Sequence, residues 1–132
     1  MKAGIWLDSH TAFIVYISNG TVQTTRVESE VEDYHVHGGA AAPSPYGTHD
    51  AVSESRILER KKQQLNRYFK DLKDRIKDCE AIYLCGPAET KVAFGKEIVR
   101  DKNLKEKLLQ VQSSSLMTEN QIIAKIKAFF RE

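Results

Sequence analysis

The amino-terminal stretch GIWLDSHTAFIVYISNGTV, residues 4–22, decides the fold because it holds two apolar, β-branched runs separated by short turns. Asn19-Gly20 is the strongest short signal for a β-hairpin, since both residue types accept a positive φ. Asp8 is suited to begin the earlier turn together with Ser9. A third β-rich run, TVQTTRVES, follows at residues 21–29, and its alternation leaves open which face is buried. We expect three antiparallel strands in a meander, with the third at a sheet edge.

A long helix is predicted from Asp50 or Ser53, either of which can serve as the N-cap, to Asp78. Apolar side chains recur at helical spacing and form one stripe: Leu58, Leu65, Phe69, Leu72 and Ile76. We expect this stripe to pack on the sheet.

The rest of the chain alternates strands with helices. Residues 81–86, AIYLCG, form a short apolar run that ends at a Gly-Pro pair, which is typical of a buried central strand. A helix is predicted at about 88–101, a strand at 107–113, and a last helix that begins with a capping box at Thr118 and Gln121. The order β-β-β-α-β-α-β-α predicts an α/β domain with a mixed five-stranded sheet, and this is also the ribonuclease-H-like order.

The composition indicates one globular domain over residues 1–132, with 41% hydrophobic and 29% charged residues. No apolar run is long enough for a signal peptide or a membrane span, so we expect a cytoplasmic protein without a membrane partner. Cys79 and Cys85 lie six positions apart across a strand, too far for a disulfide, which favours two buried thiols. The formal charge of +2 is too small to indicate a nucleic-acid partner by itself.

Residues 34–50, YHVHGGAAAPSPYGTHD, fit neither a helix nor a paired strand. Gly38 and Gly39 permit a positive φ, Ala40 begins a run of small residues without anchoring bulk, and the prolines favour extended conformations. We therefore expect a mobile loop at about residues 30–52. So long an irregular segment in a small domain is either functional or a connector without a ligand.

The order of these motifs resembles the middle domain of the eukaryotic and archaeal class 1 peptide-chain release factor and its relative Pelota. GIWLDSHTAFIVYISNGTV is similar to the family's opening hairpin, and HVHGGAAA at 35–42 lies where the family has its Gly-Gly-Gln loop. SRILERKKQQLNRYFKDL at 55–72 resembles the basic helix that follows, and AIYLCGPAETKVAFGKEIV at 81–99 resembles the next strand, glycine and helix entry. The resemblance covers nearly the whole chain and implies a stand-alone middle domain, as in bacterial relatives of the family.

The same resemblance implies work at the ribosome with an altered loop. In the release factor, the Gln of Gly-Gly-Gln helps water attack peptidyl-tRNA, whereas Ala40 stands at that position here and offers no side-chain donor or acceptor. Val36 and His37 replace the arginine that precedes the family's glycines. These departures favour a binding protein over an enzyme, without efficient hydrolysis of peptidyl-tRNA. If hydrolysis survives, His37 is the nearest candidate for a general base. The implied role is an accessory protein of translation, in rescue, release or dormancy.

The long helix supplies the positive evidence for a partner, because nine basic residues stand against three acidic ones between positions 56 and 77. Such a local field suits RNA phosphates, with an affinity that falls as salt rises. The candidate RNA-binding residues, for the ribosome or another structured RNA, are Arg56, Arg60, Lys61, Lys62 and Arg67. The alternative is a solvated basic face on a self-associating interaction module, which forms a homo-oligomer through an edge strand or a helix face and has no nucleic-acid role.

Metal-dependent chemistry has weaker support. His35 and His37 alternate, with His10 and His49 elsewhere, but a His-x-His pair alone is not specific for a zinc site, so we predict neither a metal nor a cofactor. A ribonuclease-H-like nuclease is a second alternative because Asp8 ends the first strand. Two-metal chemistry needs several carboxylates, and beyond Glu54 or Glu59 on the long helix no third is evident.

Overall fold

The structure is a computed structural model that describes the backbone of residues 1–31 and 47–131 and the side chains of residues 1–31 and 55–131. The elements follow one another as β1 (Lys2–Leu7), β2 (Thr11–Ser18), β3 (Thr21–Glu28), α1 (Gly47–Ile76), β4 (Ala81–Gly86), α2 (Thr90–Arg100), β5 (Leu108–Ser113) and α3 (Glu119–Phe130). This order confirms the predicted β-β-β-α-β-α-β-α arrangement.

The five strands form one mixed sheet in the order β3-β2-β1-β4-β5. β2 pairs antiparallel with both β1 and β3, whereas β4 pairs parallel with both β1 and β5. Asn19 and Gly20 adopt φ angles of 50° and 81°, so they close the second hairpin in the way that their residue types predicted. β3 is an edge strand, as expected from its ambiguous alternation. Its Val27 is buried against the α1 and α2 face, and Val22 packs against the opposite face.

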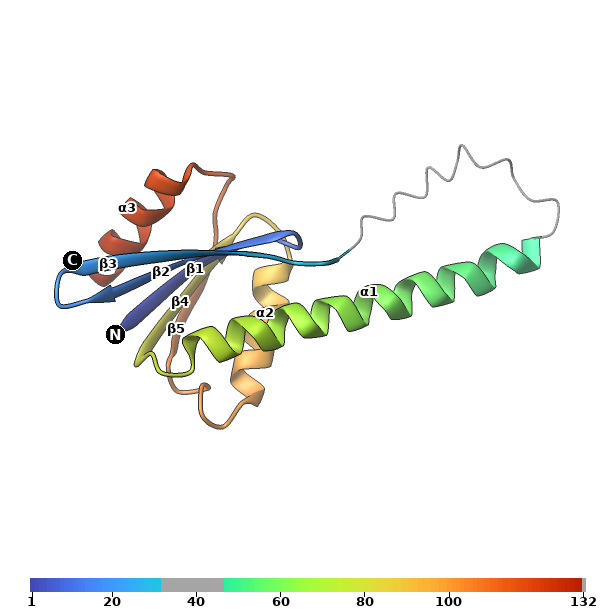
Figure 1. Cartoon of the computed structure of the whole chain (residues 1–132), viewed down its shortest axis with the longest axis horizontal. Coiled ribbons are helices and arrows are strands. Elements are labelled where there is room, and N and C mark those ends of the chain that lie inside the picture. Colours follow the sequence, from blue (N-terminus) through green and yellow to red (C-terminus); the bar gives the residue numbers. More distant parts are fainter. Residues whose placement is uncertain (32–46, 132) are drawn as a thin grey trace.

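Helices cover both faces of the sheet (Figure 1). α1 and α2 lie on one face, where Leu72 and Phe94 join a core that includes Ile5 and Leu84. α3 lies on the other face and buries Ile126 in a second, smaller core. Trp6, on β1, belongs to this second core, so side chains of one strand alternate between the two sides.

The long helix differs from its predicted form at its amino-terminal half. It begins at Gly47, so Asp50 and Ser53 lie inside the helix and are not its N-caps, and it ends at Ile76 rather than at Asp78. Leu58 is 66% exposed, which contradicts its predicted place in the core stripe, and only Leu65 and the stripe residues that follow it are buried or half-buried.

Geometry explains the exposure of Leu58. A helix of 30 residues is about 45 Å long, whereas the eight-residue strands β2 and β3 span about 26 Å. Figure 1 shows the consequence, because α1 continues past the end of the sheet toward its amino terminus. The apolar stripe of the first turns therefore has no sheet to cover.

Close backbone approaches and a helix cap fix the remaining elements. A Cβ atom added at Gly4 would overlap the side chain of Ile126, and one added at Gly86 would overlap the carbonyl oxygen of Leu7. The predicted capping box opens α3, since Thr118 Oγ1 accepts from Gln121 N at 3.2 Å and Gln121 Oε1 accepts from Thr118 N at 2.9 Å. α2 begins at Thr90, two residues later than predicted.

The predicted loop at 30–52 falls largely on residues 32–46, which lie outside the described residues. His35, His37, Gly38, Gly39 and Ala40 are therefore not described. His49 lies in the backbone of α1, and its side chain is outside the described part.

Candidate nucleic-acid interface

Five basic side chains lie on α1 between positions 56 and 67, and we call them the cationic segment: Arg56, Arg60, Lys61, Lys62 and Arg67. All five are exposed. At 100° per residue, the three arginines share one side of the helix, opposite the side that carries Leu72 farther along. By the same count, Lys61 and Lys62 lie about 120° and 140° from the arginines, one on each side of the apolar stripe that ends at Ile76. The five cations therefore lie around α1, and the first four precede Leu65, where packing of the helix on the sheet begins.

Lys61 and Lys62 differ in their ion pairs from the cations in the carboxyl-terminal part of α1. Near the end of the helix, Arg75 Nε lies 3.1 Å from Asp71 Oδ1, and Lys73 Nζ lies 4.0 Å from Glu97 of α2. Within the part of the chain that the structure describes, no ion pair involves Lys61 or Lys62. The basic charge near the end of α1 is thus partly neutralised by acidic side chains, whereas Lys61 and Lys62 are exposed.

Tyr68 lies one turn after Leu65, where packing of α1 on the core begins. Its ring is 4% exposed, and its hydroxyl donates to the carbonyl oxygen of Asp8 at 3.1 Å. Burial raises the pKa of the Tyr68 hydroxyl, and the neighbouring Asp8 and Glu28 carboxylates raise it further. Tyr68 therefore remains a neutral donor and ties the helix to the β1–β2 turn.

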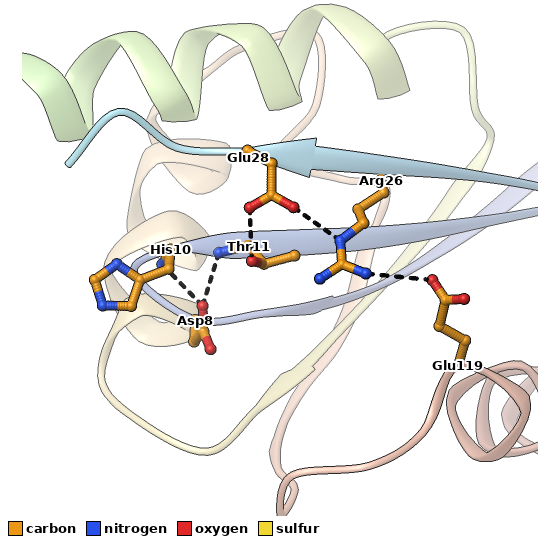
Figure 2. Close-up of polar contacts among 6 residues, drawn as sticks. All are labelled: Asp8, His10, Thr11, Arg26, Glu28 and Glu119. Carbon is orange, nitrogen blue, oxygen red and sulfur yellow. Dashed lines mark hydrogen bonds and ion pairs between the residues drawn. The ribbon is translucent and has the colours of Figure 1, made fainter.

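Asp8 has the turn-forming role predicted from its position. Its Oδ1 accepts hydrogen bonds from the backbone N–H groups of His10 and Thr11, both at 2.8 Å (Figure 2). Thr11 Oγ1 in turn donates to Glu28 Oε2 at 3.0 Å. The carboxylate that suggested a nuclease site is therefore a structural acceptor in a tight turn.

Arg26 connects the Glu28 carboxylate on β3 to α3. Arg26 Nε contacts Glu28 Oε1 at 2.8 Å, and Arg26 NH1 lies 3.8 Å from Glu119 Oε2 (Figure 2). Both Glu28 oxygens thus have donors. Among residues 1–31 and 55–131, no group of three histidine, cysteine or acidic side chains is arranged to hold a metal ion.

Arg67 has acidic surroundings that separate it from the other four cations. It lines a hollow of about 190 Å³ between the end of β3 and α1, together with the carboxylates of Glu28, Glu30 and Asp71. These anions lower the local positive potential. We therefore expect Arg67 to contribute less to phosphate binding than Lys61 and Lys62.

The two cysteines are buried, free thiols, as predicted. Burial raises the pKa of Cys85 to about 11, and the nearby Lys125 offsets only part of that effect. Burial also raises the pKa of Cys79. Both thiols stay protonated near neutral pH, so neither provides a nucleophilic thiolate.

Sequence reasoning missed one feature of α2. Lys91 is only 6% exposed, and its Nζ donates to the carbonyl oxygen of Ala88 at 2.6 Å. The residue follows a Gly-Pro turn in GPAETK, where nothing in the residue pattern distinguishes a buried lysine from an exposed one. It lines the end of a groove between α2 and β5.

No helix in the described residues is both long enough and apolar enough to cross a membrane. No protein-family model matches the chain, and no curated protein matches it.

Solved structures share the fold. The chain is similar to the archaeal translation termination factor aRF1, with a TM-score of 0.53 and 12% sequence identity, over 98% of this chain and 39% of that one. It is also similar to a structure described as an archaeal protein, with a TM-score of 0.54 and 15% identity, over 97% of this chain and 33% of that one. The chain thus spans well under half the length of either, and the likeness lies in the α/β fold.

Proposed function

We propose that this protein is an accessory factor of translation that binds the ribosome, or another structured RNA, through the cationic segment of α1. The observation that carries the proposal is the exposed group of basic side chains on helical turns that extend beyond the sheet. A helix that protrudes can lie against the backbone of structured RNA, and its cations can displace counterions from phosphates.

The fold supports a role in translation. The similarity to a translation termination factor extends over 98% of the chain, and the motif order of the sequence resembles the middle domain of that family. Under this proposal the chain corresponds to the middle domain, and Gly38 and Gly39 belong to a loop that probes the bound site. Rescue of stalled ribosomes and dormancy are the roles that suit a binding protein of this type in the cytoplasm.

Binding without efficient catalysis is the second part of the proposal. Ala40 replaces the glutamine that positions water in the release factor, so the side chain offers no donor or acceptor for hydrolysis. We expect no release of labelled peptide from stalled ribosomes above the uncatalysed rate. Release above that rate would contradict this part of the proposal, and His37→Ala would then show whether His37 acts as the base.

Co-sedimentation with ribosomes tests the binding. The protein should pellet with ribosomes at low salt and return to the supernatant at high salt. The reason is that each phosphate contact makes the logarithm of the affinity fall by about 0.7 to 0.9 for each tenfold rise in salt concentration. The triple variant Arg60→Glu, Lys61→Glu, Lys62→Glu should stay in the supernatant at both salt concentrations.

A matched control changes the same formal charge elsewhere on the surface. Lys77, Lys102 and Lys105 are exposed and lie outside the cationic segment, so their joint replacement by glutamate should leave pelleting at low salt largely unchanged. Equal losses in the two triple variants would indicate a non-specific charge effect. A wild-type protein that stays in the supernatant and sediments alone as an oligomer would instead support the self-associating module.

A further inference from the structure

The groove between α2 and β5 is a second surface that the proposed RNA contact does not use. One side of α2 faces α1, where Phe94 and Phe69 lie with ring centroids 5.2 Å apart. The other side faces β5 and leaves a groove of about 580 Å³. This volume is within the usual range for sites that bury several side chains of a ligand.

The groove has an apolar lining that is open to solvent. Val92, Gly95 and Val99 of α2 face Leu108 and Val111 of β5 across it. Val99 is 56% exposed. Gly95 lets the two elements approach, since a Cβ atom there would lie 3.2 Å from Val111 Cγ2.

Positive charge surrounds this lining. Lys91, Lys96 and Arg100 line the groove, and Glu89 is the only acidic side chain among its lining residues. Lys96 and Arg100 are four positions apart, so they stand one turn apart along the same rim. The Arg100 guanidinium approaches Glu97 at 3.5 Å but remains 75% exposed. An occupant of this groove should therefore carry aliphatic and acidic side chains together.

The strand beside the groove is suited to extended chains. β5 is an edge strand, and in the part of the chain that the structure describes only β4 pairs with it. Edge strands offer unpaired backbone groups to a further strand. The register shift between Ile82 and Tyr83 leaves Leu109 without a partner on β4, so pairing with an added strand is expected along residues 110–113.

The lining also discriminates between classes of occupant. No aromatic side chain lines the groove, so the stacking platforms that hold single-stranded nucleic acids are missing from it. A second copy of this chain would bring the same cations against Lys96 and Arg100, which is unfavourable. We propose that the α2–β5 groove binds an extended peptide segment of a partner protein, rich in aliphatic and acidic residues, which adds as a sixth strand beside β5.

A defined synthetic peptide tests this proposal on the full chain. The probe is a fluorescein-labelled peptide of about eight residues in which every second residue is threonine and the residues between are valine and glutamate in turn. Valine and glutamate then lie on the same face of the extended peptide, which is long enough to pair with β5. We expect saturable binding by fluorescence anisotropy, with amide shifts in NMR spectra concentrated on α2 and β5. A peptide with lysine in place of every glutamate should bind at least tenfold more weakly, since it opposes the rim charges.

Two groove variants and two matched controls locate the site. Val99→Glu and Lys96→Glu should each weaken peptide binding by roughly tenfold, because one adds an anion to the lining and the other reverses a rim charge. Leu116→Glu is the same kind of change at a residue that is 81% exposed outside the groove, and Lys70→Glu reverses an exposed cation on α1. Both controls should bind the peptide like the wild type.

Three outcomes would overturn the proposal. The first is an absence of saturable binding by the glutamate–valine peptide. The second is binding of a short single-stranded RNA that is abolished by Val99→Glu and by Lys96→Glu and is not displaced by the peptide. That result would assign the groove to nucleic acid. The third is a dimer in solution that Val99→Glu dissociates, because a second copy would then cover the groove.

Discussion

Replacing two leucines of α1 by alanine separates the part of the helix that belongs to the core from the part that does not. Leu72 is fully buried in the larger core, whereas Leu58 is 66% exposed. Leu72→Ala removes buried methylene and methyl groups and leaves a cavity, which costs about 2–5 kcal/mol in the free energy of unfolding. Leu58→Ala should change it by less than about 0.5 kcal/mol, since alanine also has the higher helix propensity.

Urea unfolding followed by tryptophan fluorescence measures both variants. Trp6 is the sole tryptophan, is 4% exposed and lies in the core on the opposite face of the sheet, so its emission reports unfolding of the whole domain. With a slope of about 1–3 kcal/mol per molar urea, Leu72→Ala should lower the midpoint by roughly 1–2 M. The reasoning fails if Leu58→Ala costs more than about 1 kcal/mol, because α1 would then be packed along its whole length.

Four further experiments test the contacts of the sheet and its helices. Gly4→Ala should destabilise the fold by about 1–3 kcal/mol, because the added methyl group overlaps Ile126. In a double-mutant cycle followed by urea unfolding, Ile126→Ala should lower the free energy of unfolding less in the Gly4→Ala variant than in the wild type. Gly86→Ala should cost more than Gly4→Ala, since it meets backbone that no side-chain change relieves. Thr118→Ala should cost about 1 kcal/mol, whereas Thr118→Ser should retain most of the cap. Burial raises the pKa of the Cys85 thiol from 9.0 to about 11, so this thiol loses its proton at a lower pH in the unfolded chain than in the folded one. The free energy of unfolding should therefore fall as the pH rises from 9 to 11. The fall should be less steep in Cys85→Ala, which lacks the thiol.

The order of elements could be predicted because local signals set it. Asn19 and Gly20 specify a hairpin by their own backbone preferences, and the Thr118 capping box starts α3 by contacts within one turn. The apolar run of β4 is short enough to be a strand and too short for a helix. Each of these features depends on neighbours in the sequence.

The place where α1 leaves the sheet could not be predicted in this way. Leu58 and Leu72 are both leucines on the same stripe, so their spacing predicts that both are buried. Their different exposure follows from the length of the helix relative to the strands beneath it, which is a property of the assembled sheet. The groove beside β5 was missed for the same reason, since Val99 and Val111 meet only after β5 joins the edge.

The two halves of α1 explain why so much of the chain stands outside the core. An isolated helix of the length that protrudes is only marginally stable in water, so its turns depend on continuity with the half that packs on the sheet. Leu72 and Ile76 anchor that half by burial, and Tyr68 adds a hydrogen bond to the β1–β2 turn at the boundary. In the described part, the protruding turns contribute little to the core, since Leu58 is exposed and Ile57 is only half-buried. Turns that carry basic side chains and little core are explained best by a ligand that the helix reaches beyond the sheet.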